Sequence, residues 1–180
     1  MRILLAVFVL LSLLGGAADA AAPYVRPTIV FFYVDELNAG EPEKNEIRRE
    51  TIEKFADKYS AAYTLRLGDT YAKEFAVSRF TDLANLDKFG LLPRLAADRV
   101  DYAVFYNVLP LRTKGTGMMV QLPTTTSSVL LRIYDLRKNA YVCDSTFTYS
   151  STWAWPSSHL AKLYEDIDSQ VFAARFPVRN

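Results

Sequence analysis

A short, almost continuously apolar run from Thr28 to Val34 constrains the fold more than any other feature of this sequence. Most of its residues are β-branched or aromatic, which favours a strand, and its lack of alternation is typical of a strand covered on both faces. A second strong strand signal covers Val100 to Leu111, where Pro110 marks an end or an edge. The chain therefore has to bring helices to both sides of a sheet.

Helical periodicity follows the first of these runs. Pro42 fits the first turn of a helix. Apolar residues then recur at the spacing of one helical face, at Ile52, Phe55, Ala56, Tyr59 and Tyr63. We expect this helix to pack on the sheet.

Three shorter elements are expected before the second apolar run. A strand from Tyr63 to Leu67 precedes a helix from Tyr71 to Phe80, which Asp69 can cap. The segment from Thr81 to Asp98 is also helical in character. Because Gly90 and Pro93 interrupt it, we expect two pieces there.

The carboxy-terminal half is typical of a hairpin followed by a helix. A strand from Ser128 to Leu136 precedes the turn residues Arg137-Lys138-Asn139. In the strand after the turn, alternation predicts a core-like face made of Tyr141, Cys143, Ser145, Phe147 and Tyr149. The clearest amphipathic helix comes last, with Ser157 as its expected cap and an apolar face made of Leu160, Leu163, Tyr164, Ile167 and Val171.

The order of these elements, β-α-β-α-α-β-β-β-α, predicts the fold class. We expect an α/β fold: a single layered domain in which a mixed β-sheet with an antiparallel carboxy-terminal meander has helices packed on its faces.

The first twenty residues have the layout of a cleaved signal peptide. Arg2 supplies a positive charge, Ile3 to Leu14 form an apolar run, and small residues lead to Ala20. The run is shorter than the roughly 20 residues that span a bilayer. We therefore predict cleavage after Ala20, with residues 1–20 as signal and 21–180 as one domain of about 160 residues, exported and soluble.

Charge and composition exclude several classes of function. Lys plus Arg number 21 against 20 for Asp plus Glu, so a net charge of +1 gives no footprint for nucleic acid. One Cys and one His exclude a disulfide framework and a Cys/His zinc site. No later segment is long and apolar enough to cross a membrane. No phosphate-binding loop motif occurs either, and no cofactor is predicted.

Two segments in the second half carry a recognisable pattern. Ala97 to Tyr106 reads A-D-R-V-D-Y-A-V-F-Y, and Ser128 to Val142 reads S-V-L-L-R-I-Y-D-L-R-K-N-A-Y-V. This pattern resembles the bacterial envelope proteins grouped with the curli secretion channel component, the penicillin-binding-protein activator lipoproteins and the amino-terminal domain of TolB. The likeness covers Thr28 to Phe176 in element order and Val100 to Tyr149 in residues.

The resemblance implies a TolB amino-terminal-domain-like fold and a compartment, the bacterial envelope. It also implies a non-catalytic module that binds or assembles with a protein partner. The family-level residues that it transfers are structural: Asp101-Tyr102 at the start of a strand and Asp135 before the hairpin turn. The chain departs from the pattern because it has no lipidation Cys and no pair of long hairpins for a transmembrane barrel.

Two groups of residues are candidates for contact with a partner. The segment Arg112 to Ser127 exceeds the usual hairpin loop and has an apolar centre that includes Met118, Met119 and Leu122. The alternatives are a mobile loop or an extension of the two strands.

Trp153 and Trp155 are the second group. They project to one side of an extended backbone and, with Tyr149, can stack on a sugar or bind a peptide. The alternative is that both tryptophans cap the core.

Catalytic sets are weakly supported. Cys143 or a serine beside His159 forms no recognisable signature, so a core Cys and a surface His are the preferred interpretation. The acidic residues Asp35, Glu36, Glu41 and Glu43 match no calcium loop and predict a solvated segment.

The leading hypothesis is an exported, non-catalytic envelope module with a protein partner. The alternatives are a secreted hydrolase and a binder of glycan or peptidoglycan.

Overall fold

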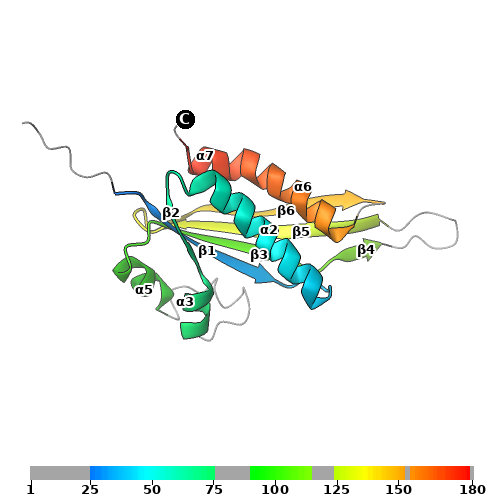
Figure 1. The fold of residues 1–180 in the computed structure, drawn as a ribbon, viewed down its shortest axis with the longest axis horizontal. Helices are drawn as coiled ribbons and strands as arrows, with labels where there is room; N and C mark the ends of the chain where they lie inside the picture. The colour runs from blue at the N-terminus through cyan, green and yellow to red at the C-terminus, as the bar shows by residue number, and fades with distance from the viewer. Residues whose placement is uncertain (1–24, 76–89, 115–123, 153–154, 179–180) are drawn as a thin grey trace, which may run out of the picture.

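One mixed β-sheet forms the centre of the molecule (Figure 1). The computed structural model describes residues 25–75, 90–114, 124–152 and 155–178. The strands are β1 (Thr28–Asp35), β2 (Thr64–Leu67), β3 (Tyr102–Val108), β4 (Arg112–Lys114), β5 (Thr124–Asp135) and β6 (Ala140–Ser151). β1 lies between β2 and β3 and is parallel to both, whereas β5 is antiparallel to β3, β4 and β6. The predicted α/β fold with an antiparallel carboxy-terminal part is confirmed.

Two long helices cover one face of the sheet (Figure 1). α2 (Glu41–Tyr59) and α6 (Pro156–Ile167) pack their apolar sides on β1, β3 and β5, in a cluster rich in aromatic rings. The Tyr59 hydroxyl donates to Asp168 Oδ1 at 2.6 Å, which joins the end of α2 to the turn after α6. Burial on this face explains why the predicted periodicity of both helices is confirmed.

The end of α6 departs from α-helical spacing. A π-turn, Asp168–Phe172, follows α6 and leads into the short α7 (Ala173–Arg175). The extra residue in this turn carries Phe172, rather than the predicted Val171, fully into the core. Val171 is partly buried beside it.

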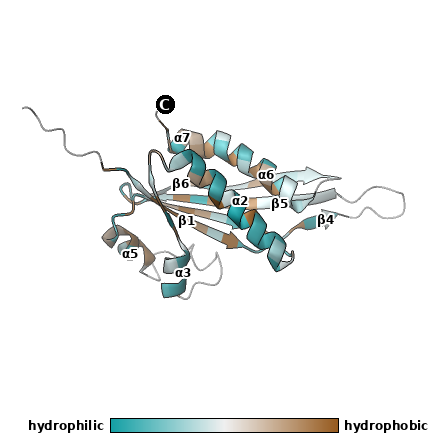
Figure 2. Ribbon diagram, viewed as in Figure 1, coloured by the Kyte–Doolittle hydropathy of each residue, from teal (hydrophilic) through white to brown (hydrophobic). Residues whose placement is uncertain are grey.

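Two short helices cover the opposite face. α3 (Asp69–Glu74) and α5 (Leu91–Ala97) pack against a second apolar cluster, in which the rings of Phe32 and Phe105 stack with centroids 4.7 Å apart. Figure 2 shows hydrophobic colour along the central strands and a largely hydrophilic outer side on α2. The apolar run at Thr28 is therefore covered on both faces, as its sequence predicts.

Neither predicted helix cap forms. Asp69 is the first residue of α3, with Gly68 at the N-cap, and its carboxylate pairs with Arg48 instead. Trp155 is the N-cap of α6, and no side-chain cap bond forms there. Ser157 therefore lies inside the helix rather than at its cap, because Pro156 starts the helix two residues earlier than predicted.

A β-bulge changes one face of β6. Ile133 pairs with Cys143 and Tyr134 with Tyr141, so Val142 is an extra residue in the strand. The slip moves Tyr141 to the face of Tyr134, where their rings meet edge to face at 5.0 Å. The prediction that Tyr141 shares the face of Cys143 is therefore wrong, and Val142 packs beside the core in its place.

The strands around residues 115–123 are longer than predicted. Lys114 pairs with Thr124 and Thr113 with Thr125, so both ends of the expected loop belong to β4 and β5. Of the alternatives considered for Arg112 to Ser127, extension of the strands is confirmed for its two ends. Met118, Met119 and Leu122 lie outside the described residues.

Candidate functional site

The outer strand β6 is the longest exposed backbone edge in the described part of the molecule. It pairs with β5 along one side, and no other strand among the described residues pairs with its other side. Most of its side chains are exposed. An edge strand of 12 residues presents a row of backbone donors and acceptors on which another extended chain can add.

The face of β6 that points away from α2 and α6 is polar. Arg132 Nε donates to Asp144 Oδ1 at 2.9 Å, and the hydroxyls of Thr126 and Ser150 lie 2.7 Å apart. Such cross-strand pairs fix the register of the ribbon while they leave the face wettable. We use the name β6 surface for this edge together with Tyr141, Asp144, Thr146, Thr148, Ser150 and Trp155, all of which are exposed.

Trp155 is the most exposed aromatic side chain on this surface. Its side chain is 80% exposed at the start of α6, at the same end of the sheet as the β4–β5 hairpin (Figure 1). Its backbone oxygen accepts the Ser158 hydroxyl at 2.8 Å, which fixes the turn that carries it. The alternative prediction that Trp155 caps the core is wrong, whereas Trp153 lies outside the described residues.

Tyr149 does not join a stack with Trp155. Its ring packs edge to face on His159, with centroids 5.0 Å apart, and it lies partly buried against the core. The aromatic trio considered from the sequence therefore has one exposed member among the described residues.

His159 is buried, so the prediction of a surface histidine is wrong. Its side chain lies between α6 and β5, where Nδ1 is 3.2 Å from the Ser127 hydroxyl, and both residues are fully inaccessible to solvent. Burial lowers the pKa of the imidazole, because the charged form loses its hydration. A serine and a histidine thus meet here, but they are closed off from any substrate.

Cys143 is half-buried in β6. Its thiol lies 4.0 Å from the Leu131 carbonyl oxygen. Burial raises the pKa of the thiol, so the unreactive protonated form is favoured. The geometry suits the predicted structural role at a shallower depth than expected.

The acidic residues after β1 are partly organised. Asp35 Oδ1 accepts the Leu37 amide at 2.7 Å, and burial raises the pKa of the Asp35 carboxyl. Glu41 and Glu43 lie in the first turn of α2, where negative charge is favourable. In the described ranges no group of three or more His, Cys, Asp or Glu side chains is placed to hold a metal ion.

The two structural aspartates predicted from the resemblance have the expected positions. Asp101 Oδ2 accepts the Thr28 amide at 2.7 Å, which ties the start of β3 to the start of β1. Asp135 is buried, and its Oδ1 accepts the amides of Arg137 and Lys138 at 3.0 and 3.1 Å, which closes the hairpin turn. Both carboxylates stabilise the backbone.

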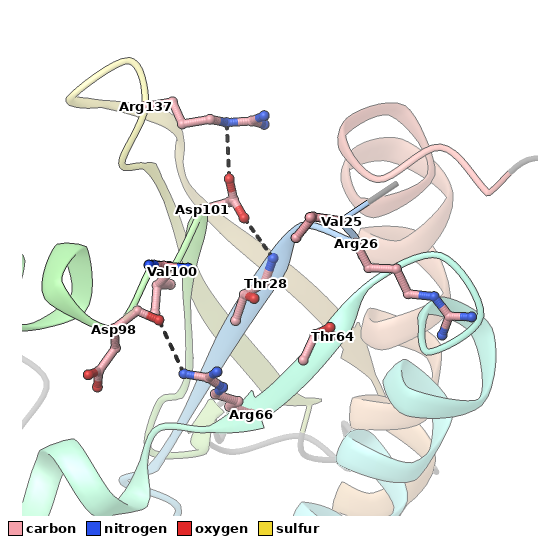
Figure 3. A pocket seen from close by; sticks show the side chains of 10 residues that line it. Val25, Arg26, Thr28, Thr64, Arg66, Asp98, Val100, Asp101 and Arg137 are labelled. Atoms are coloured by element: carbon pink, nitrogen blue, oxygen red, sulfur yellow. Dashed lines mark hydrogen bonds and ion pairs between the residues drawn. The ribbon is translucent and has the colours of Figure 1, made fainter. Parts of the chain in front are cut away.

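A pocket at the opposite end of the sheet was not predicted. It has a volume of about 650 Å³ and is lined by four arginines, Arg26, Arg66, Arg99 and Arg137 (Figure 3). They come from four separate segments, so no local motif brings them together in the sequence. We call this the arginine pocket.

Known proteins share the fold of this chain but not its sequence. Neither a family model nor a curated protein matches it. The crystal structure of lipoprotein GNA1162 from Neisseria meningitidis has a TM-score of 0.51 at 13% identity, covering 81% of this chain and 98% of that one. Hypothetical protein CT253 from Chlamydia trachomatis has a TM-score of 0.51 at 14% identity, covering 83% and 97%.

TolB from Acinetobacter baumannii matches with a TM-score of 0.42 at 13% identity, covering 89% of this chain and 31% of that one. The resemblance predicted from the sequence is confirmed at the level of the fold. None of the described helices is long and apolar enough to span a bilayer.

Proposed function

We propose that this chain is an exported, non-catalytic module of the bacterial envelope that binds or assembles with a protein partner through the β6 surface. The observation that carries the proposal is the outer side of the 12-residue strand β6, along which no other strand of the described residues is paired. Backbone addition to such an edge supplies affinity without a deep pocket, and side chains that alternate along the strand supply specificity.

Trp155 adds an anchor to this surface. Aromatic side chains are enriched among the residues that contribute most to protein interfaces, and this ring is 80% exposed next to the end of β6. The fold shared with lipoprotein GNA1162 supports a place in the envelope, and the signal-like segment 1–20 supports export. We expect the mature protein to begin at Ala21.

The test is capture of partners by the mature protein and by matched variants. Trp155→Ala removes the anchor, and Thr146→Lys with Thr148→Lys places charge along the edge, which disfavours strand addition. Arg49→Gln on the outer side of α2 is the control. We expect one stoichiometric protein to bind the wild type and the control with equal affinity. Its affinity for each β6-surface variant should be lower by a factor of roughly ten or more.

Equal retention of that protein by all variants would contradict the β6 surface as the binding site. If the wild type captures no partner but its tryptophan fluorescence changes when glycan fragments bind, the result would favour the carbohydrate-binding alternative. Hydrolysis of an envelope substrate by the wild type would contradict the non-catalytic part of the proposal. Amino-terminal sequencing of exported protein that still begins at Met1 would contradict cleavage.

A further inference from the structure

The arginine pocket lies where the parallel strands begin and the β5–β6 hairpin turns (Figure 3). Its walls come from the residues before and at the start of β1, from β2, from the junction between α5 and β3, and from the hairpin turn. Two valines, two threonines and two aspartates supply the remaining lining. A volume of about 650 Å³ is within the range of pockets for small ligands.

The two aspartates that line the pocket are already engaged. Asp101 accepts the Thr28 amide through Oδ2 and lies 3.4 Å from Arg137 Nε through Oδ1. Asp98 accepts the Tyr71 hydroxyl at 2.7 Å and pairs with Arg94, which does not line the pocket. The aspartates therefore leave a surplus of positive charge.

Three arginines of the pocket form no ion pair with a carboxylate among the described residues. Arg26 and Arg66 donate to the backbone oxygens of Ser60 and Asp98, both at 3.3 Å. The Arg99 side chain has no hydrogen-bond or ion-pair partner in the part of the chain that the structure describes. Figure 3 shows Arg26 turned toward the end of α2, and the Arg137 guanidinium is held at the hairpin turn by Asp101 and the Tyr102 hydroxyl. Arg66 and Arg99 are the two remaining arginines that line the pocket.

The backbone at Arg99 is unusual for an arginine. The Arg99 amide bonds to the Ala96 oxygen and the Val100 amide to the Leu95 oxygen, both at 3.0 Å, which is the Schellman arrangement that ends a helix. Its central position is left-handed and favours glycine, yet Arg99 occupies it with φ of 56°. Stability alone would not select a long charged side chain there, and the side chain that is present lines the pocket.

We propose that the arginine pocket is a binding site for a phosphate group, with Arg66 and Arg99 as its ligands. A guanidinium fork pairs with two oxygens at once, and a phosphate has enough oxygens for two such forks, whereas a single fork already uses both oxygens of a carboxylate. The pocket is larger than a phosphate ion, so the remaining space fits the body of a phosphorylated small molecule.

The probe is pyrophosphate, added to the mature protein and followed by calorimetry and by thermal melting. We expect saturable binding and a rise in melting temperature that sodium chloride at equal ionic strength does not reproduce. Succinate is the carboxylate control and should bind at least tenfold more weakly. Equal affinity for succinate would overturn the assignment to phosphate.

Two variants separate a ligand role from a structural one. Arg99→Gly suits the left-handed backbone, so the free protein should melt no lower than the wild type while its pyrophosphate affinity falls roughly 10- to 100-fold. Arg66→Gln should lower the affinity by a similar factor. The control Arg49→Gln removes an exposed arginine of α2 and should bind like the wild type.

Loss of affinity in both pocket variants with retention in the control supports the proposal. No binding to the wild type in any arm, or equal binding in all variants, overturns it. Vesicles containing phosphatidylglycerol form a separate arm: binding of vesicles but not of pyrophosphate, abolished by the same two variants, keeps the phosphate chemistry and identifies a lipid headgroup as its source.

Discussion

The parallel and antiparallel halves of the sheet differ in what covers them. β1 and β3 have nearly every residue buried, because helices pack on both of their faces. β6 alternates between exposed and half-buried positions, and its outer side has no paired strand in the described fold. One sheet therefore contains central strands whose side chains belong to the core and an outer strand whose side chains leave a surface for contact.

This difference teaches where substitutions should be costly. In β1 and β3 nearly every side chain is surrounded, so a lost group leaves a cavity and an added group meets a neighbour. At the exposed positions of β6, water can replace what is removed. Four predictions follow this contrast, from the largest expected effect to the smallest.

The strongest test is Phe105→Ala in β3. Phe105 is 2% exposed and stacks on Phe32, so its removal should lower the free energy of unfolding by about 3–5 kcal/mol. The same change at Phe147 in β6 should cost less than half as much, because that ring is only partly buried. Urea denaturation measures both, and equal losses would remove the contrast between the halves.

Gly68→Ala tests close packing beside β1. A Cβ at Gly68 would clash with the ring of Phe32, and because the backbone there has φ of −75°, the contact alone sets the cost. We expect a loss of about 1–3 kcal/mol in unfolding free energy. Gly40→Ala is the control, since its Cβ would meet Pro42 at an ordinary 3.7 Å, and should cost about 0.5 kcal/mol or less. No loss at Gly68 would show that Phe32 has room to move.

His159 gives the antiparallel half its own buried ionisable group. Its pKa is lowered in the folded protein, so the unfolded chain takes up a proton first as the pH falls. Stability should be full above the ordinary pKa of about 6.5 and decrease below it, with a slope of at most about 1.4 kcal/mol per pH unit. Melting between about pH 7.5 and pH 5.5 measures this slope. His159→Gln should abolish it, and an unchanged slope in that variant would assign it to other groups.

The smallest effect is expected at Asp144. Its pair with Arg132 is solvent-accessible, so Asp144→Asn should change the free energy of unfolding by less than about 1 kcal/mol. High salt should reduce even that change. A loss above about 2 kcal/mol in chemical denaturation would mean that the β6 surface is more rigid than its exposure indicates.

Strand positions and the fold class were predictable because they depend on patterns within a few residues of one another. The run at Thr28, the hairpin around Asn139 and the apolar face of α6 are confirmed on that basis. The bulge at Val142 and the π-turn before Phe172 were not, because each inserts one residue where tertiary packing requires it. Each insertion moves the residues beyond it to another face.

The candidate sites were only partly predictable. Trp155 was singled out from its residue type, and its exposure favours contact with a partner. The arginine pocket was missed, because its residues are far apart in the chain and an arginine in a strand or turn is not distinctive. The burial of His159 was missed too, since its partner Ser127 comes from another element 32 residues away.

The length of the β5–β6 ribbon has a consequence for communication within the molecule. Each strand has 12 residues, so the ribbon spans about 40 Å from its turn to its far end. Arg137 is in that turn, and Ser151 is at the other end. Mobile ions screen the interaction between exposed charges beyond about 8 Å in physiological salt. A charge at one end of the ribbon therefore has almost no electrostatic effect at the other end. An effect of one end on the other therefore depends on the packed residues that lie between them.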